Sequence, residues 1–205
     1  MGHMISIVRA SIALLALWAP GMACYAGEAV TEPDRRNSLT VFAGSLMTGT
    51  FPGWTLIPYA GGVEGNHLVS AAYQRHLFDL PWGFTTAAEA GLAARFGDGT
   101  SGELWGGAVL GHQGLTIGPV TVSPALVVGL SAVTGPIGIE RQREITDNGD
   151  ATLLFYLGPE LAFRHKRHPN VSFVYRVHHR SGAEGTLGNM REGHNANLFG
   201  VRLDF

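Results

Sequence analysis

The sequence predicts an all-β fold, an eight-stranded antiparallel transmembrane β-barrel, and three observations support this. Hydrophobic residues make up 45% of the 205 residues, whereas charged residues make up only 15%. Beyond Ala26, no apolar run approaches the roughly 20 residues that a membrane-spanning helix needs. Segments of about 11 to 14 residues instead alternate between apolar and other side chains, as strands with one face in lipid do.

The N-terminal 26 residues are expected to be separate from the barrel. Residues 1–3 precede a second start-like methionine and resemble an expression scar. Arg9, the apolar run 12–18 and the small-x-small sequence Cys24-Tyr25-Ala26 then describe a secretory signal peptide, which we expect to be cleaved after Ala26. The predicted domains are a scar with a signal peptide over 1–26 and an outer-membrane β-barrel over 27–205.

Alternation with period two recurs along the chain. In the segment from Phe84 to Phe96, one register is apolar, while the other holds Thr85, Glu89 and Arg95. Such inward charges are expected to pair in the lumen. A soluble barrel of the lipocalin type is the alternative, but the charges are too few to coat its outside. The candidate strands lie near 38–48, 67–79, 84–96, 102–115, 120–130, 153–163, 170–182 and 194–205.

The connections between these strands predict an orientation. Short ones lie near 81–83, 117–118 and 165–169, and longer ones near 49–66, 132–148 and 183–193, with the connection 98–101 as an exception. Short turns of such barrels face the periplasm, and long loops face outside. The last strand alternates to an aromatic end at Phe205, which resembles the signal read by the outer-membrane assembly machinery. We therefore expect a multi-pass barrel in the bacterial outer membrane, with that machinery as a partner.

Charge and residue spacing exclude some function classes. The net charge of −2 provides no basic footprint, so nucleic acid is not an expected partner. Histidine and carboxylate residues recur at no spacing that is typical of metal ligands, so neither a metal nor another cofactor is expected. The sequence leaves a monomer and a homodimer open.

The segment 170–182 carries the candidate chemistry. Its odd-numbered face continues from apolar side chains to His179 and Ser181, whereas Arg176 and Arg180 lie on the face assigned to the lumen. Two residues apart on one strand face, Cα atoms are about 6.6 to 6.8 Å apart. An imidazole and a hydroxyl at this spacing are a candidate base and nucleophile. Polar groups near the membrane interface cost only ~0–1 kcal/mol.

The sequence His179-Arg180-Ser181 resembles the PagL family of outer-membrane lipid A deacylases. That family carries a His-x-Ser motif on the lipid-facing side of a barrel strand, followed by an acidic residue in the last loop. The resemblance implies that Ser181 is the nucleophile, His179 the general base and Glu192 the third catalytic residue. It also implies lipopolysaccharide as substrate, with hydrolysis of the 3-O-linked acyl ester of lipid A. The chain departs from the family at Gly182, where the family has asparagine.

Several assignments stay open. Asn195 is the second choice for orienting His179, because an amide can take that role. Gly182, Asn195 and Asn197 are candidates for the oxyanion donors or for orienting the site. Acyl chains are expected along Phe173, Tyr175, Val177 and Phe199. The alternative function is a non-catalytic small outer-membrane barrel that binds lipid or an external ligand through its long loops.

Overall fold

The computed structural model describes residues 36–53, 57–58 and 60–205, so the predicted scar and signal peptide lie outside it. The described part of the chain forms nine strands, one α-helix and a short 3-10 helix. These are β1 (Asn37–Met47), β2 (Val63–Asp79), η2 (Pro81–Gly83), β3 (Phe84–Gly97), β4 (Thr100–His112), β5 (Leu115–Ile117), β6 (Val120–Val133), α1 (Gly138–Asp147), β7 (Leu153–His165), β8 (Val171–Ser181) and β9 (Glu192–Asp204).

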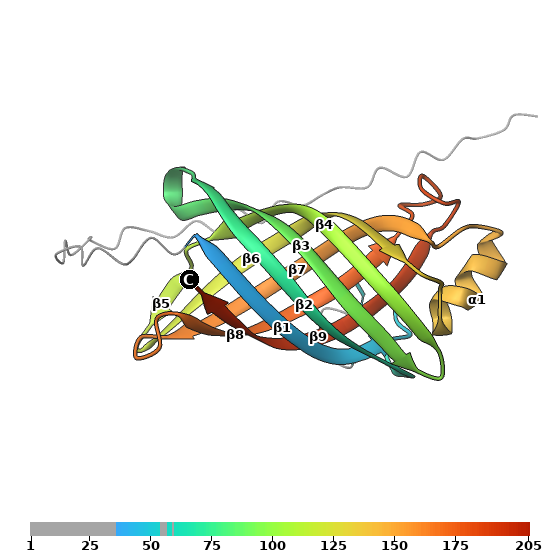
Figure 1. Cartoon of the computed structure of the whole chain (residues 1–205), viewed down its shortest axis with the longest axis horizontal. Helices are drawn as coiled ribbons and strands as arrows, with labels where there is room; N and C mark the ends of the chain where they lie inside the picture. The colour runs from blue at the N-terminus through green and yellow to red at the C-terminus, as the bar shows by residue number, and fades with distance from the viewer. Residues whose placement is uncertain (1–35, 54–56, 59) are drawn as a thin grey trace, which may run out of the picture. The chain divides into compact units, whose positions relative to one another are not determined.

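Eight long strands close into an antiparallel barrel. Figure 1 shows this barrel from the side, with α1 at one end. β1 pairs with β9 and β4 pairs with β6, while the three-residue β5 only extends the hairpin before β6. Because the barrel is closed, no long strand that the structure describes has an unpaired edge. This is required in lipid, where no water can bond to free backbone groups. The predicted fold class is confirmed. Within the described residues, no helix is long and apolar enough to cross a membrane.

The outer face of the barrel is apolar. Alternate side chains along the strands point outward and are exposed, among them Val41, Val69, Leu92, Leu104, Val128, Phe173 and Val201. The opposite set fills the lumen with apolar residues such as Phe42, Leu68 and Val127, together with buried charged groups. An apolar outside around a partly polar inside is the pattern of a membrane barrel and the inverse of a lipocalin.

The charged groups of the lumen pair with one another. Arg176 lies 2.6 Å from both Glu89 and Glu160, and Arg95 lies 2.6 Å from Glu140 on α1. These side chains are completely buried, and an unpaired charge there would be strongly destabilising. The predicted pairing of lumen charges is confirmed, with Glu140 as a partner that strand alternation alone did not reveal.

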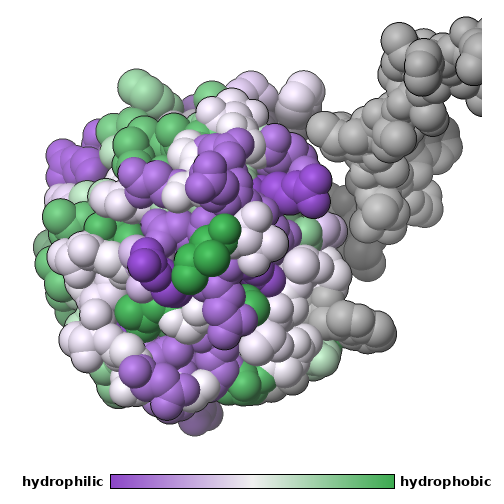
Figure 2. Space-filling model, turned by 90° about the vertical axis from the view of Figure 1, so that its right-hand side faces the viewer, coloured by the Kyte–Doolittle hydropathy of each residue, from purple (hydrophilic) through white to green (hydrophobic). Residues whose placement is uncertain are grey.

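The two ends of the barrel differ. The connections 48–62, 134–152 and 182–191 lie at one end, and α1 belongs to the second of them. Figure 2 faces the end that carries α1 and shows hydrophilic side chains gathered there among scattered hydrophobic ones. The C-terminus and the short turn 166–170 lie at the other end (Figure 1). By the usual rule for such barrels, the α1 end faces outside and the other faces the periplasm.

Candidate active site

His179 and Ser181 lie on the outer face of β8, close to its α1 end. Their neighbours His178 and Arg180 point the other way, because both hydrogen-bond to groups of the lumen. Successive side chains of a strand point to opposite faces. The imidazole and the hydroxyl are thus on the membrane side of the barrel wall, near its outer rim.

An irregularity between β8 and β9 shapes the site. His179 pairs with Asn195 and Ser181 pairs with Glu192, so two steps along β8 match three steps along β9. Such a bulge reverses the alternation of the bulged strand. Asn195 and Glu192 therefore both pair across from the outward residues of β8, although one is odd-numbered and the other even-numbered.

Gly193 lies within this bulge, and the space around it accommodates only glycine. A Cβ atom there would lie 2.6 Å from Leu154 Cδ1 and 2.9 Å from the Arg180 carbonyl oxygen. Atoms this close would force the backbone to shift. The glycine thus permits the local geometry that brings Glu192 next to the histidine strand.

Asn195 orients the His179 imidazole. Its Oδ1 lies 2.6 Å from His179 Nδ1, and its Nδ2 donates to the Gly49 carbonyl oxygen at 2.7 Å. Because that carbonyl can only accept, the amide has its oxygen toward the ring, and Nδ1 must carry the hydrogen. The unprotonated nitrogen of neutral His179 is then Nε2, which accepts no hydrogen bond from any described residue.

Glu192 forms no hydrogen bond or ion pair with the His179 imidazole among the described residues, and its carboxylate lies near the Asn195 amide instead. One carboxylate oxygen accepts from the Phe51 backbone N–H at 3.0 Å. The other lies 3.5 Å from Asn195 Nδ2 and 3.6 Å from Arg143 Nη1. Glu192, the first choice from the sequence for orienting His179, thus lies near the Asn195 amide nitrogen. Asn195, the second choice, is the residue that hydrogen-bonds to the imidazole.

Two residues from distant loops complete the surroundings of His179. The Phe51 ring stacks on the imidazole with centroids 4.5 Å apart. Arg143, on α1, donates to the carbonyl oxygens of Gly193 and Thr48 at 2.8 and 3.1 Å. His179 is only 7% exposed although it faces outward, and the Phe51 ring covers one face of its imidazole. Neither Phe51 nor Arg143 lies near the motif along the chain, so the sequence did not reveal either residue as part of the site.

Ser181 is half-buried and lies two residues after His179 on the same face of β8. No hydrogen bond joins its hydroxyl to His179 or to any other side chain among the described residues. Hydrogen bonds between catalytic groups are often formed only when substrate is bound. The site therefore presents an oriented imidazole and an unengaged hydroxyl on one face of one strand.

The remaining candidates have structural partners. A Cβ at Gly182 would lie 2.0 Å from the Met190 carbonyl oxygen, so packing of the 182–191 loop requires glycine there. Asn197 Nδ2 donates to Tyr175 Oη at 2.9 Å. Among the expected lipid contacts, Phe173 is 49% exposed, whereas Val177 is 2% exposed despite its outward register.

Phe199, on β9, packs against the two aromatic residues of this face of β8. Its ring centroid is 6.0 Å from that of Phe173 and 5.2 Å from that of Tyr175. Aromatic pairs at such separations stabilise a surface beyond their simple burial. The three rings form an outward aromatic surface on β8 and β9. This surface lies further from the α1 end of the barrel than His179 and Ser181 do.

A second cluster of potential ligands lies in the lumen. Glu103, His178 and His194 each place a potential metal-ligating atom within 4.8 Å of the others. Sequence spacing could not reveal the cluster, because it joins β4, β8 and β9. Arg95 and Arg180 each lie 3.7 Å from the Glu103 carboxylate, and their charges oppose a cation there.

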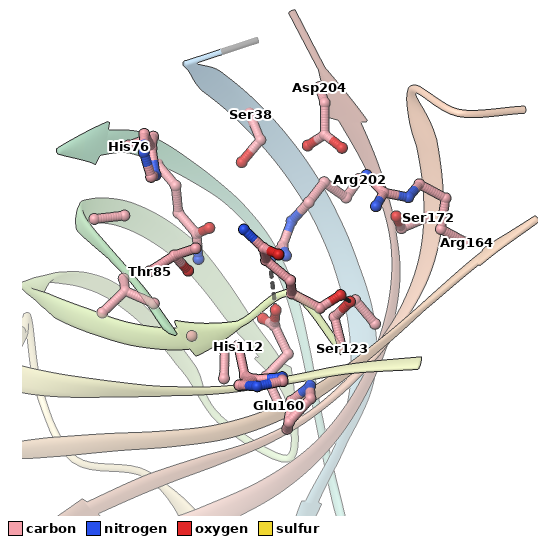
Figure 3. Close-up of a pocket in the computed structure, with 18 of the residues that line it drawn as sticks. Ser38, His76, Thr85, His112, Ser123, Glu160, Arg164, Ser172, Arg202 and Asp204 are labelled. Carbon is pink, nitrogen blue, oxygen red and sulfur yellow. Dashed lines mark hydrogen bonds and ion pairs between the residues drawn. The ribbon is translucent and has the colours of Figure 1, made fainter. Parts of the chain in front are cut away.

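A polar cavity of about 280 Å³ opens at the other end of the barrel, away from His179. Figure 3 shows the side chains that line it, among them Ser38, His76, Thr85, His112, Ser123, Glu160, Arg164, Ser172, Arg202 and Asp204. Arg202 is already paired with Glu160 at 2.6 Å. This polar cavity lies at the end assigned to the periplasm and is separate from the candidate catalytic residues.

Comparison with known proteins identifies the architecture. The sequence matches no family model and no curated protein. The solved structure of the outer membrane enzyme PagL is similar, with a TM-score of 0.54 and 13% identity over 82% of this chain and 99% of that one. Neisserial surface protein A is also similar, with a TM-score of 0.51 and 13% identity over 82% and 96%. The chain has the fold of the small barrels of the bacterial outer membrane, and the predicted location is confirmed.

Proposed function

We propose that this barrel is a lipid A 3-O-deacylase, a carboxylic ester hydrolase that removes an acyl chain from lipopolysaccharide in the outer leaflet. One observation carries the proposal. Asn195 holds the outward-facing His179 so that Nε2 is the basic nitrogen, on the same strand face as the Ser181 hydroxyl. The similarity to PagL, an outer membrane enzyme, supports it, and the 3-position rests on the resemblance of the motif.

The reaction follows from the roles of these groups. Ser181 Oγ attacks the ester carbonyl while His179 Nε2 accepts the hydroxyl proton. The imidazolium then gives that proton to the departing sugar oxygen, which leaves an acyl group on Ser181. A water molecule attacks the acyl-enzyme with His179 again as base, and the fatty acid leaves as the serine hydroxyl reforms.

Asn195 and Glu192 have different parts in this mechanism. Asn195 holds the tautomer with hydrogen on Nδ1 and steadies the imidazolium that forms during the reaction. Glu192 acts as a positioning residue, because it fixes the Phe51 backbone and lies against the Asn195 amide. Both Asn195 Nδ2 hydrogens face acceptors, so we assign the oxyanion to backbone N–H groups at Gly182 instead.

The lipid would approach sideways from the membrane. Phe173 is exposed on the same face of β8 as the catalytic residues, and the Phe199 ring packs near both Phe173 and Tyr175. Acyl chains lying along these rings would keep the ester at the outer rim, where Ser181 lies. A substrate that stays in the membrane needs no enclosed pocket in the protein.

The test is a comparison of lipid A masses from outer membranes that contain the parent chain or its variants. The parent should remove one hydroxyacyl group, and Ser181→Ala should leave lipid A intact. Ser172→Ala is the matched control, because this serine lies on the same strand but is buried on the lumen side. An unchanged lipid A spectrum with correctly folded parent protein would refute the proposal.

A non-catalytic barrel that binds lipid or an external ligand is the second candidate. It is favoured by one observation, namely that Ser181 and His179 share no hydrogen bond among the described residues. The similarity to Neisserial surface protein A is compatible with it. Lipid A that copurifies with the parent chain without losing an acyl group would support this candidate over the hydrolase.

A further inference from the structure

A second serine and histidine pair lies on the outer face of the barrel. Ser45 Oγ on β1 is 3.1 Å from His67 Nδ1 on β2, and the His67 side chain is exposed. Ser45 also pairs with Asn197 on β9, so the pair lies near the outer rim, two strands from β8. Unlike His179 and Ser181, these two side chains already hydrogen-bond to each other.

Two shallow hollows of the barrel surface meet below this pair. The first is lined by Ser45, His67 and Phe96, and the second by Phe173, Phe199 and Val201. Ala43 and Val69 line both, so the hollows are continuous, and we name them together the β1 groove. The groove is polar at the outer rim and apolar toward the middle of the membrane, which matches the head and tail of an acyl chain.

The β1 groove is also continuous with the proposed active-site surface. Phe173 and Phe199 belong both to the groove and to the expected lipid contacts of β8 and β9. From β8 to β2 the surface crosses three strand spacings, about 14 Å at the usual separation of neighbouring strands. A lipid that reaches from Ser181 to His67 must carry acyl chains on well-separated positions.

We infer that the β1 groove binds a second acyl chain of the same lipid whose ester faces Ser181. This inference rests on the proposed function. The Ser45 and His67 pair hydrogen-bonds to the ester or hydroxyl oxygens at the head of that chain, and Ala43 leaves the space for its methylenes. Chains on adjacent carbons, as in a glycerophospholipid, do not span this distance, so the site selects an acylated disaccharide.

Lipid retention tests the groove without any hydrolysis. In a Ser181→Ala background, Ala43→Trp fills the groove, whereas Ala108→Trp adds the same side chain to an exposed outward position on β4. Native mass spectrometry in detergent then measures the bound fraction with added hexa-acylated lipid A or with phosphatidylethanolamine. We expect about tenfold weaker retention of lipid A with Ala43→Trp, from the lost burial of a few methylenes, and no loss with Ala108→Trp.

The outcomes separate this inference from the proposed function. Equal retention by the two tryptophan variants, or equal binding of the phospholipid by the parent, overturns the groove, even if the parent hydrolyses lipid A. Weaker retention by Ala43→Trp with a parent that hydrolyses nothing supports an acyl-binding groove and overturns the deacylase.

Kinetics give a second measurement. Ser45→Ala in the active chain should raise KM several-fold and leave kcat within about twofold, since this residue contacts the lipid away from the reacting ester. A loss of kcat with unchanged KM would instead overturn the assignment of Ser45 to chain binding, because it would place Ser45 at the chemical step.

Discussion

His178 and His179 are adjacent on β8 but face opposite sides of the barrel wall. His178 Nε2 lies 2.7 Å from the Glu103 carboxylate in the lumen, and His179 Nδ1 lies 2.6 Å from the Asn195 amide outside. A carboxylate is the more usual partner of a catalytic histidine. Judged by its partner alone, His178 would be the better base. The surroundings of each histidine therefore determine which of them can act on a substrate.

The serines near each histidine make the difference clear. In the lumen, Ser131 donates to Glu103 at 2.6 Å and accepts from Arg180 at 3.0 Å, so its hydroxyl is engaged on both sides. Outside, the Ser181 hydroxyl has no such partner among the described side chains. On the inner face, the polar groups hydrogen-bond to one another and fill the barrel. On the outer face, a base and a nucleophile are left that a membrane lipid can reach.

The largest expected effect is a split between the two histidines. His179→Gln should lower the rate of deacylation by about 10³-fold or more, because no base then activates Ser181. His178→Gln should retain hydrolysis within a few-fold and instead lower the stability of the barrel, since Glu103 loses its closest histidine. Lipid A mass spectra and urea unfolding followed by tryptophan fluorescence measure the two effects. Equal loss of hydrolysis in both variants would contradict the comparison.

The fold follows from local pattern, and much of the site does not. Alternation from Phe84 to Phe96 is a property of neighbouring residues, so it predicts β3 almost to its ends. The position of Glu192 depends on the bulge around Gly193, which changes which side chains face outward. Arg143 and Phe51 reach the site only through tertiary packing of two loops. No periodicity in the sequence reports such contacts.

Substitution of a buried charged residue on the inner face should strongly lower the stability of the barrel, whereas substitution on the exposed outer face should not. Arg176→Met removes the cation that lies 2.6 Å from both Glu89 and Glu160, leaving two buried carboxylates without it. Breaking buried pairs of this kind costs about 3–5 kcal/mol. Leu92→Met, on the exposed outer face, is the control and should leave the midpoint of urea unfolding nearly unchanged. A stable Arg176→Met barrel would mean that water or rearrangement replaces the pair.

On the outer face, Asn195 and Glu192 should differ in how much each contributes to the rate of deacylation. Asn195→Ala should slow deacylation by about 10²-fold, because the imidazole loses the acceptor that fixes its tautomer. Glu192→Ala should have a smaller effect, since this carboxylate contacts the amide and the Phe51 backbone but not the ring. Steady-state rates of lipid A hydrolysis rank the two variants. The reverse order would make Glu192 the residue that orients His179.

The ionisation of Glu140, at the α1 end of the lumen, should make the stability of the barrel depend on pH in acid. Burial acts to raise the pKa of Glu140, but the charges of His194, Arg180 and Arg95 lower it from 4.5 to about 2. A carboxylate with a lowered pKa in the folded state stabilises the barrel above pH 4.5, and this contribution is lost as the pH falls toward 2. The stability gap between the parent and Glu140→Gln should therefore narrow over that interval, by at most about 1.4 kcal/mol per pH unit. Urea unfolding at a series of pH values measures it, and a gap that stays constant would show that the Glu140 carboxylate is not held ionised by these neighbours.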